Sequence, residues 1–324
     1  MCGLEFIVTD EMTNGVVTIG NFDGVHRGHQ SMLSIVARIA GQHARPSVVV
    51  TFDPHPIAVL RPKSALPRLT TIERRTELLQ QYGADHVVVL PVNAALLNME
   101  PQAFFQKVVL QRLQAAALVE GPDFHFGRNR TGNTGLLATL CSAAGLELTV
   151  IDAVCLNDVA HGVSAAEGQS PVDQVPADQI VSSTRIRQLL EHGHVGRAVR
   201  LLGHPHRISG TVTTGAGRGR TLGFPTANLE KIEVLLPQPG VYGGLAWLHG
   251  TSYRTAVSIG PNPTFSDLGH KVECHLIDFD GDLYGKTLAV DLLTELRPLQ
   301  TFPDQSSLMA QIASDLELCR QLPL

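Results

Sequence analysis

The spacing of hydrophobic residues changes once along this chain, and the first half alternates between two patterns. Residues 16–19 and 47–52 are short apolar runs, the second rich in β-branched side chains, and they predict buried strands. Between them, apolar residues recur at helical spacing. The alternation continues with predicted helices at 72–82, from 101 onward and at 136–144, and with predicted strands at 86–92, 116–119 and 148–154. It predicts an α/β fold, in which a parallel sheet carries helices on both faces and binds ligands at the carboxyl ends of its strands.

The second half of the chain carries a different pattern. Short alternating apolar and polar runs begin near His204 and are separated by turns such as Asp280-Gly281, which predicts a small antiparallel β-barrel. The expected strands cover residues 206–212, 241–247, 255–259, 272–278 and 287–293. A closing helix follows, with Leu308, Ile312 and Leu316 on one face.

Between these halves the pattern lapses and then recovers as two short helices. Residues 155–179 are rich in Gly, Ser, Asp, Pro and Ala, and they predict a surface loop. Helical spacing returns at 184–191 and 195–202. Because a chain of 324 residues exceeds the usual size of a single core, we predict two domains, residues 1–202 and residues 203–324.

Composition excludes several classes of protein. The formal net charge is −5 and charged residues make up 17% of the chain, so no basic surface typical of a nucleic-acid-binding protein is expected. The five cysteines are odd in number and none have C-x-x-C spacing, which indicates neither a disulfide framework nor a zinc knuckle. There is no signal-peptide pattern and no apolar run long enough to span a membrane. The chain is expected to be a soluble cytoplasmic protein, and its oligomeric state does not follow from the pattern.

The first candidate site follows the first predicted strand. Glycines at 20, 24 and 28 allow a ligand to approach the backbone closely, and the helix after them offers free N–H groups to phosphate. His26 and His29 stand three apart at that helix start, where both can donate hydrogen bonds to one phosphoryl group. A zinc-ligand pair or two incidental surface histidines are the alternatives, but zinc needs further ligands at recognisable spacing. The preceding strand and the three glycines favour phosphate chemistry.

A second candidate anion site lies at the start of the helix predicted near 184–191. It combines hydroxyl groups with arginines in the first turn: Ser183, Thr184, Arg185 and Arg187. Arginine at a helix N-terminus opposes the helix dipole, which suggests that an anion compensates it. The alternative is that Ser183 is only an N-cap and that the arginines are solvated.

The third candidate site is the glycine-rich run at 215–228. Basic residues stand among its glycines, and no strand–helix unit surrounds it. It therefore predicts a loop that folds over phosphates rather than a dinucleotide-binding fold.

Four motifs resemble those of known families. The run from His26 to His29 resembles the H-x-G-H signature of the nucleotidyltransferase superfamily, and residues 225–228 (P-T-A-N) resemble the signature of riboflavin kinases. The segments 51–56 and 121–128 resemble the flavin adenylyltransferase module of bacterial bifunctional riboflavin kinase/FAD synthetases. The resemblance implies a Rossmann-like nucleotidyltransferase domain with a parallel sheet, followed by a riboflavin kinase β-barrel with a terminal helix. It covers nearly the whole chain apart from 155–179.

The resemblance also implies roles for individual residues. His26 and His29 would stabilise the charge that develops on the α-phosphate of ATP, and Glu273 would take the proton from the ribityl hydroxyl. Thr226 and Asn228 would hold Mg²⁺, for which hydroxyl and amide oxygens are suitable hard ligands. ATP-binding roles are implied for Gly20, Phe22, Asp23, Gly28, Ser183, Thr184, Arg185, Arg187, Gly217, Gly219, Arg220, Thr226 and Asn228. Flavin-binding roles are implied for Phe52, Pro54, Asp123 and Phe124. From the residue pattern alone, the alternatives are a core position for Phe124 and a solvated strand position for Glu273.

The predicted function is the synthesis of flavin cofactors in two steps that use ATP and Mg²⁺. Riboflavin becomes FMN in the C-terminal domain, and FMN becomes FAD in the N-terminal domain with release of pyrophosphate. The expected partners are riboflavin, FMN, FAD and ATP, with no nucleic acid and no membrane. The alternatives are a riboflavin kinase with a silenced adenylyltransferase domain, a flavin- or nucleotide-sensing binding protein, and a cytidylyl- or pantetheine-type transferase, which the P-T-A-N motif disfavours.

Overall fold

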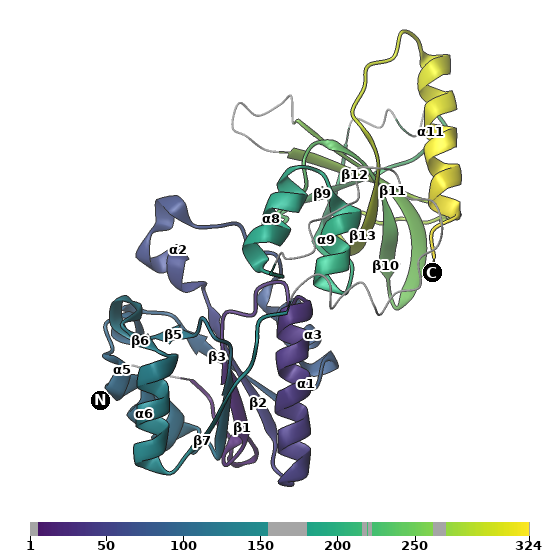
Figure 1. The fold of residues 1–324 in the computed structure, drawn as a ribbon. Helices are drawn as coiled ribbons and strands as arrows, with labels where there is room; N and C mark the ends of the chain where they lie inside the picture. The colour runs from purple at the N-terminus through teal and green to yellow at the C-terminus, as the bar shows by residue number, and fades with distance from the viewer. Residues whose placement is uncertain (1–5, 155–179, 216–218, 220–221, 262–269, 324) are drawn as a thin grey trace. The chain divides into compact units, whose positions relative to one another are not determined.

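The computed structural model describes residues 6–154, 180–215, 219, 222–261 and 270–323 (Figure 1). The stretch 155–179, predicted to be a surface loop, lies outside the described residues. The described chain divides into two compact units, one that ends at Val181 and one that begins at Ser182.

The first unit is the predicted α/β fold. Its strands are β1 (Val16–Ile19), β2 (Ser47–Asp53), β3 (His86–Pro91), β4 (Ala117–Glu120), β5 (His125–Phe126), β6 (Gly132–Asn133) and β7 (Glu147–Val150). Its α-helices are α1 (Arg27–Gln42), α2 (Pro56–Leu60), α3 (Ile72–Gln81), α4 (Ala94–Leu97), α5 (Pro101–Phe104) and α6 (Thr134–Ala144). The shorter or irregular helices are η1 (Asp10–Met12), η2 (Pro62–Ser64), the π-helical η3 (Phe105–Arg112) and η4 (Arg128–Arg130).

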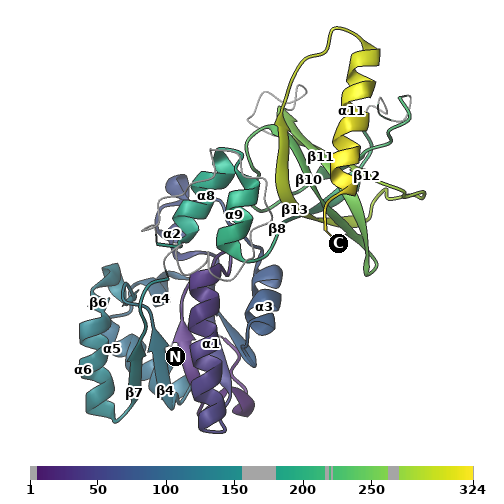
Figure 2. The same ribbon diagram turned by 45° about the vertical axis from the view of Figure 1, so that its right-hand side comes forward.

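Five strands of this unit form one parallel sheet in the order β3-β2-β1-β4-β7. Alternate residues along each strand face opposite helical layers, because successive side chains of a strand point to opposite faces. Val17 and Val48 belong to a core cluster that contains residues of α5, η3 and α6, whereas Val16 and Val49 pack with residues of α1 and α3. Figure 2 shows α1 and α3 together on one side of the sheet and α6 on the other.

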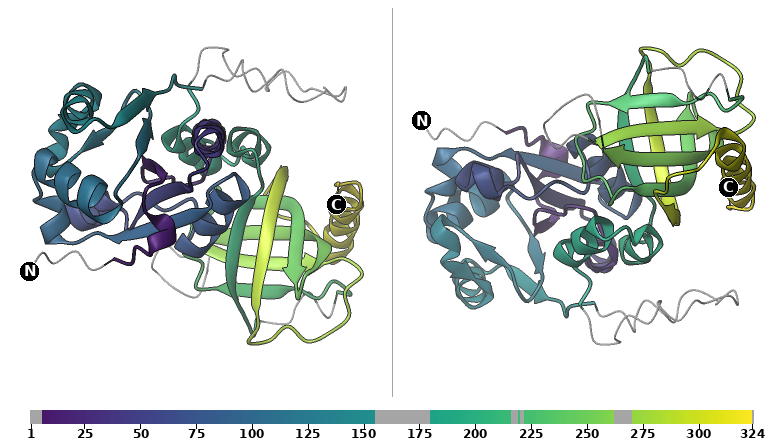
Figure 3. Two further views of the ribbon diagram at one scale, coloured as in Figure 1. Left: turned by 90° about the horizontal axis from the view of Figure 1, so that it is seen from below. Right: turned by 90° about the horizontal axis from the view of Figure 1, so that it is seen from above.

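The second unit is the predicted antiparallel barrel with a terminal helix. It contains α8 (Ser183–Glu191), α9 (Val195–Leu202), β8 (His206–Thr213), β9 (Ala227–Glu230), β10 (Gly240–Leu248), β11 (Thr251–Pro261), β12 (His270–Leu276), β13 (Thr287–Pro298) and α11 (Gln305–Arg320). The strands close in the order β10-β11-β12-β9-β8-β13 (Figure 3). In β8 every second residue is buried, which is the pattern of a strand with one face on a barrel core.

The contacts of α8 and α9 group these helices with the barrel. α9 packs against β8 and β13, and α8 packs against α9. The division of the described chain by contacts therefore falls before α8, earlier in the sequence than the predicted boundary between residues 202 and 203. That boundary stays a prediction about how the two activities are divided.

Three local expectations needed revision. The helix expected from residue 101 begins as α5 but continues as the π-helical η3, and β7 ends at Val150 instead of residue 154. The strand β9 was not expected, because its four residues, A-N-L-E, are too few to show a period. It exists because it pairs with β8 on one side and β12 on the other and so closes the barrel.

Candidate functional site

The H-x-G-H segment lies at the carboxyl edge of the parallel sheet. It follows β1, and the order of the strands reverses direction between β1 and β4. In open α/β sheets ligands bind at such a reversal, outside the carboxyl ends of the strands. The segment 20–26 reaches α1 through a tight turn, in which Gly24 has a φ of +83° and the non-glycine residues Phe22 and Val25 have φ values of +48° and +35°. Backbone strain of this kind is concentrated at functional sites.

The two histidines of this segment lie face to face. The His26 and His29 ring centroids are 3.6 Å apart with an interplanar angle of 16°, and the Phe22 ring contacts His29 edge-on at 5.0 Å. His26 is the N-cap residue of α1. A side chain at Gly28 would place its Cβ 3.2 Å from the His26 ring, so glycine leaves room for the stacked pair.

His29 is held in its neutral form. Its pKa is lowered well below 6.5, mainly because the ring is shielded from water, and further by the positive charges of His26 and Arg75. The Nδ1 atom of His29 is buried and has no hydrogen-bond partner among the described residues. A neutral imidazole keeps one N–H donor, which at a helix start can be given to a phosphate.

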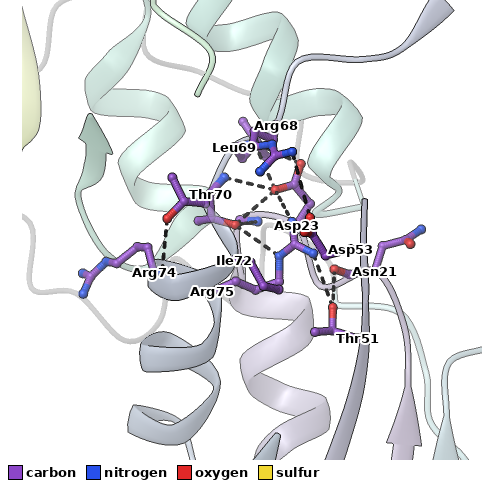
Figure 4. A network of polar contacts seen from close by, with 12 residues as sticks. Asn21, Asp23, Thr51, Asp53, Arg68, Leu69, Thr70, Ile72, Arg74 and Arg75 are labelled. Atoms are coloured by element: carbon purple, nitrogen blue, oxygen red, sulfur yellow. Dashed lines mark hydrogen bonds and ion pairs between the residues drawn. The ribbon is translucent and has the colours of Figure 1, made fainter. Parts of the chain in front are cut away.

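Asp23, predicted to bind ATP, faces the protein. Its carboxylate accepts hydrogen bonds from the backbone N–H of Leu69 at 3.0 Å and of Thr70 at 3.1 Å, and it pairs with the Arg75 guanidinium at 3.4 Å (Figure 4). Both members of the ion pair are 3% exposed, so the pair belongs to the interior. Gly20 and Phe22 lie in the same loop, where Phe22 is buried.

A buried carboxyl group that no motif indicated lies beneath this loop. Glu120, the last residue of β4, is 1% exposed, and its Oε1 accepts a hydrogen bond from the Ile19 backbone N–H at 2.9 Å. Burial raises its pKa well above 4.5, against the opposing effect of that hydrogen bond. The signal available in the sequence was a charged residue at the end of an otherwise apolar strand.

The predicted flavin-binding residues occupy two loops of the same unit. Phe52 is half-buried near the end of β2, and Pro54 is exposed just after it. Asp123 is exposed, while the Phe124 ring stacks on Phe126 at 5.4 Å and packs partly against the core. Phe126 is thus a core residue, and Phe124 keeps an exposed part that a ligand can contact.

The segment from Ser183 to Arg187 belongs to the second unit. Ser182, one residue before the expected position, is the N-cap of α8, and its hydroxyl accepts a hydrogen bond from the Arg185 backbone N–H at 3.3 Å. Arg187 is buried rather than solvated, whereas Thr184 is exposed. The ATP-binding role of this segment rests on its sequence motif.

The barrel brings together two residues predicted to act in the kinase reaction, Asn228 and Glu273. Asn228 on β9 pairs directly with Glu273 on β12 in the antiparallel register, so their side chains lie on the same face. On the other side of β9, Thr213 of β8 is the register partner of Asn228. The Glu273 carboxylate forms an ion pair with Lys271 at 2.8 Å, and both side chains are about one-third exposed.

Glycines bring the backbone of the glycine-rich segment against this row. A Cβ at Gly215 would meet Nδ2 of Asn228 first and would lie 2.7 Å from its Cγ. A Cβ at Gly219 would meet the backbone carbonyl of Phe224 first and would lie 3.3 Å from the Thr226 hydroxyl. Both approaches are close enough that any side chain would displace its neighbour. Gly215 therefore lies against Asn228 and Gly219 against Phe224 and Thr226, while Gly217 and Arg220 lie outside the described residues.

Asn228 fits the predicted magnesium site. Its Oδ1 is buried and accepts no hydrogen bond from any described residue, and the same holds for the hydroxyl of Thr213. Buried oxygens without a donor are costly unless a ligand satisfies them. An amide oxygen beside threonine hydroxyls and a carboxylate suits a hard cation that keeps part of its water. Thr213 was missed in the sequence because a threonine on an alternating strand carries no distinctive pattern.

No helix in the described part of the chain is both long and apolar enough to cross a membrane.

Comparison with known proteins finds matches in both halves. A family model described as FAD synthetase matches residues 8–165, and one described as riboflavin kinase matches residues 202–322. A bifunctional riboflavin kinase/FMN adenylyltransferase of Listeria monocytogenes is 33% identical over 314 residues, which are 95% of this chain and 93% of that protein. The protein of the same name from Escherichia coli is 33% identical over 93% of this chain and 90% of its own length.

A solved structure is similar in fold over nearly the whole chain. It comes from Streptococcus pneumoniae and is named a macrolide-efflux protein; its TM-score is 0.83 at 28% identity, over 98% of this chain and 96% of that one.

Proposed function

This chain belongs to the family of bifunctional riboflavin kinase/FMN adenylyltransferases, and from that membership we propose that Glu273, Thr226 and Asn228 carry the kinase reaction and that His26 and His29 carry the adenylylation. The chain is a transferase with two activities, which use ATP as co-substrate. We assign them to residues 203–324 and 1–202, a division that the ranges of the two family matches support.

In the kinase step the terminal ribityl hydroxyl of riboflavin attacks the γ-phosphorus of ATP, and ADP leaves. Glu273 accepts the hydroxyl proton, a role supported by its partial exposure and by its position opposite Asn228. Thr226 and Asn228 hold Mg²⁺, which when bound neutralises charge on the phosphates. The backbone at Gly215 and Gly219 lies against these ligands and limits where the phosphates can sit.

In the adenylylation step a phosphate oxygen of FMN attacks the α-phosphorus of ATP, and pyrophosphate leaves. The nucleophile is already ionised, so no base is required, and positioning and charge stabilisation dominate. His29, held neutral by its surroundings, donates an N–H to the α-phosphate beside His26. Gly20, Phe22 and Gly28 shape the loop around ATP, and Phe52, Pro54, Asp123 and Phe124 contact the flavin. An ATP-binding role for the segment from Ser183 to Arg187 is proposed from its sequence motif alone.

The observation that carries this proposal is the alignment of Asn228, with its unsatisfied oxygen, directly opposite Glu273. We also propose that the enzyme acts in the cytoplasm, with no nucleic-acid or membrane partner, in keeping with its net charge of −5.

The proposal is tested by incubating the purified chain with riboflavin, ATP and Mg²⁺ and separating the three flavins by chromatography over time. FMN followed by FAD is the expected result. FMN alone would indicate a silenced adenylyltransferase, and neither product would indicate a binding protein.

A further inference from the structure

We propose that Arg75 is a positioning residue for FMN adenylylation, which joins the ATP-binding loop to the flavin-binding end of β2. This inference rests on the proposed function of the first unit, and it concerns a residue outside every motif that indicated that function.

Arg75 lies where a helix normally presents an apolar side chain. It shares the buried face of α3 with Leu78 and Leu79, at positions i, i+3 and i+4, and it is 3% exposed. A guanidinium that is buried without partners is strongly destabilising, so its donors have to be satisfied by neighbouring groups. The contacts that satisfy the Arg75 guanidinium therefore hold it in one geometry.

The donors of Arg75 reach two loops that are far apart in sequence. Nη2 pairs with Asp23 in the segment between β1 and α1, at 3.4 Å. Nη1 donates to the Phe52 carbonyl at 3.1 Å and lies 3.4 Å from the Thr51 hydroxyl, both at the end of β2. Figure 4 shows the Arg75 guanidinium between Asp23 and Thr51.

The same network continues to the backbone of the ATP-binding loop. The Thr51 hydroxyl donates to the Asn21 carbonyl at 3.0 Å, and the Thr70 hydroxyl accepts from the Gly24 N–H at 3.2 Å. Asn21 and Gly24 flank Phe22, whose φ of +48° requires support from its surroundings. Through one planar fork, Arg75 thus fixes the strained loop that precedes His26 and the residue Phe52, proposed to contact flavin.

Arg75 has a second effect, which is electrostatic. Burial is the main reason why the pKa of His29 is low. The positive charges of His26 and Arg75 lower it further. His26 and Arg75 are the charged groups that lower the pKa of His29, and Arg75 is itself paired with Asp23. Removal of the guanidinium should therefore raise the pKa of His29, whereas lysine at this position should leave it nearly unchanged.

The test compares Arg75→Lys, Arg75→Met and the control Arg74→Met. The control removes a guanidinium from the adjacent position of the same helix, where Arg74 pairs with the exposed Glu77 at 3.0 Å. Lysine keeps the charge but lacks the planar fork by which two separate nitrogens of Arg75 reach Asp23 and Phe52. We expect Arg75→Lys to lower kcat for FMN-to-FAD conversion roughly 10- to 100-fold, as misplacement of about 1 Å does, with riboflavin phosphorylation by the same chain within twofold of wild type.

Two further measurements do not depend on activity. Hydrogen exchange should rise in segments 20–26 and 51–53 of Arg75→Lys but not of Arg74→Met. The NMR titration of His29 should move to higher pH in Arg75→Met only. Arg75→Met leaves Asp23 buried without its cation, so Arg75→Lys keeps the test open if the methionine variant does not fold.

The outcomes separate the two proposals. Adenylylation kinetics and hydrogen exchange of Arg75→Lys that match those of Arg74→Met would overturn the positioning role. If the wild-type chain makes no FAD, the proposed function of the first unit fails, while hydrogen exchange still decides whether Arg75 holds the two loops.

Discussion

The glycine-rich segment gives the sharpest prediction, because a single methyl group at Gly215 has no space. In Gly215→Ala the new Cβ would lie 2.7 Å from Cγ of Asn228. Nδ2 of the same side chain would lie closer still, and ordinary contact begins at 3.4 Å, so the Asn228 side chain must move by more than about 0.7 Å, the difference for Cγ alone. Because displacement of a catalytic group by about 1 Å costs roughly 100-fold in rate, we expect riboflavin phosphorylation to fall roughly 10- to 100-fold.

The assay is the initial rate of FMN formation at varied MgATP concentration, with FMN-to-FAD conversion as an internal measure of intact protein. The matched control is Gly223→Ala. Gly223 has a φ of +83°, and no atom lies within 4 Å of the point where its Cβ would stand, so alanine there strains the backbone by roughly 1–2 kcal/mol without touching Asn228. We expect the control to lower the melting temperature and to retain kinase activity within threefold.

A double-mutant cycle isolates the displaced group. If Gly215→Ala acts through Asn228, it should change the rate less than twofold in an Asn228→Ala background, since the side chain to be displaced is already absent. A full additional loss in that background, or wild-type kinetics of Gly215→Ala alone, would refute the assignment of Asn228 to the phosphate site.

Three other substitutions test the remaining assignments. Glu273→Gln should lower FMN formation roughly 100- to 10,000-fold, the usual contribution of a general base, and should leave FMN-to-FAD conversion unchanged. The control Glu317→Gln, at an exposed side chain of α11, should leave both activities unchanged; loss of both activities in folded Glu273→Gln would contradict the two-site assignment. His29→Ala should give the reverse pattern, with FMN accumulating in the flavin assay, and continued FAD formation would remove His29 from the mechanism. Glu120→Gln tests the buried carboxyl. Because burial raises the pKa of Glu120 above 4.5 in the folded protein, the protonated carboxyl stabilises the fold fully below the pKa of the unfolded chain, and this contribution is lost as pH rises through the folded-state pKa. Relative to wild type, Glu120→Gln should therefore become more stable from about pH 4.5 upward, with a maximum difference in unfolding free energy of roughly 1–3 kcal/mol. A melting-temperature difference between the two proteins that stays constant from pH 4 to pH 8 would show that Glu120 does not titrate in this way.

Local pattern was sufficient for most of the architecture. The strands β1 and β2 and the helix α3 fall within a residue or two of the predicted ranges, because runs of apolar residues and helical spacing act over a few neighbours. The contact of His26 with His29 was predictable for the same reason, since a separation of three at a helix start places two side chains on one face. The family motifs also identified both activities.

What the sequence could not give is the set of contacts between distant segments. Glu120 meets Ile19 across 101 positions, and Asp23 meets Arg75 across 52. Asn228 reaches Glu273 only because β9 enters between β8 and β12, although four residues of weak pattern did not predict a strand. The sequence alone indicated which reactions the chain carries, because each motif is a run of adjacent residues that can be recognised without the fold. The order and register of the strands decided which side chains face one another, because a shift of a single residue in that pairing would turn every side chain to the opposite face.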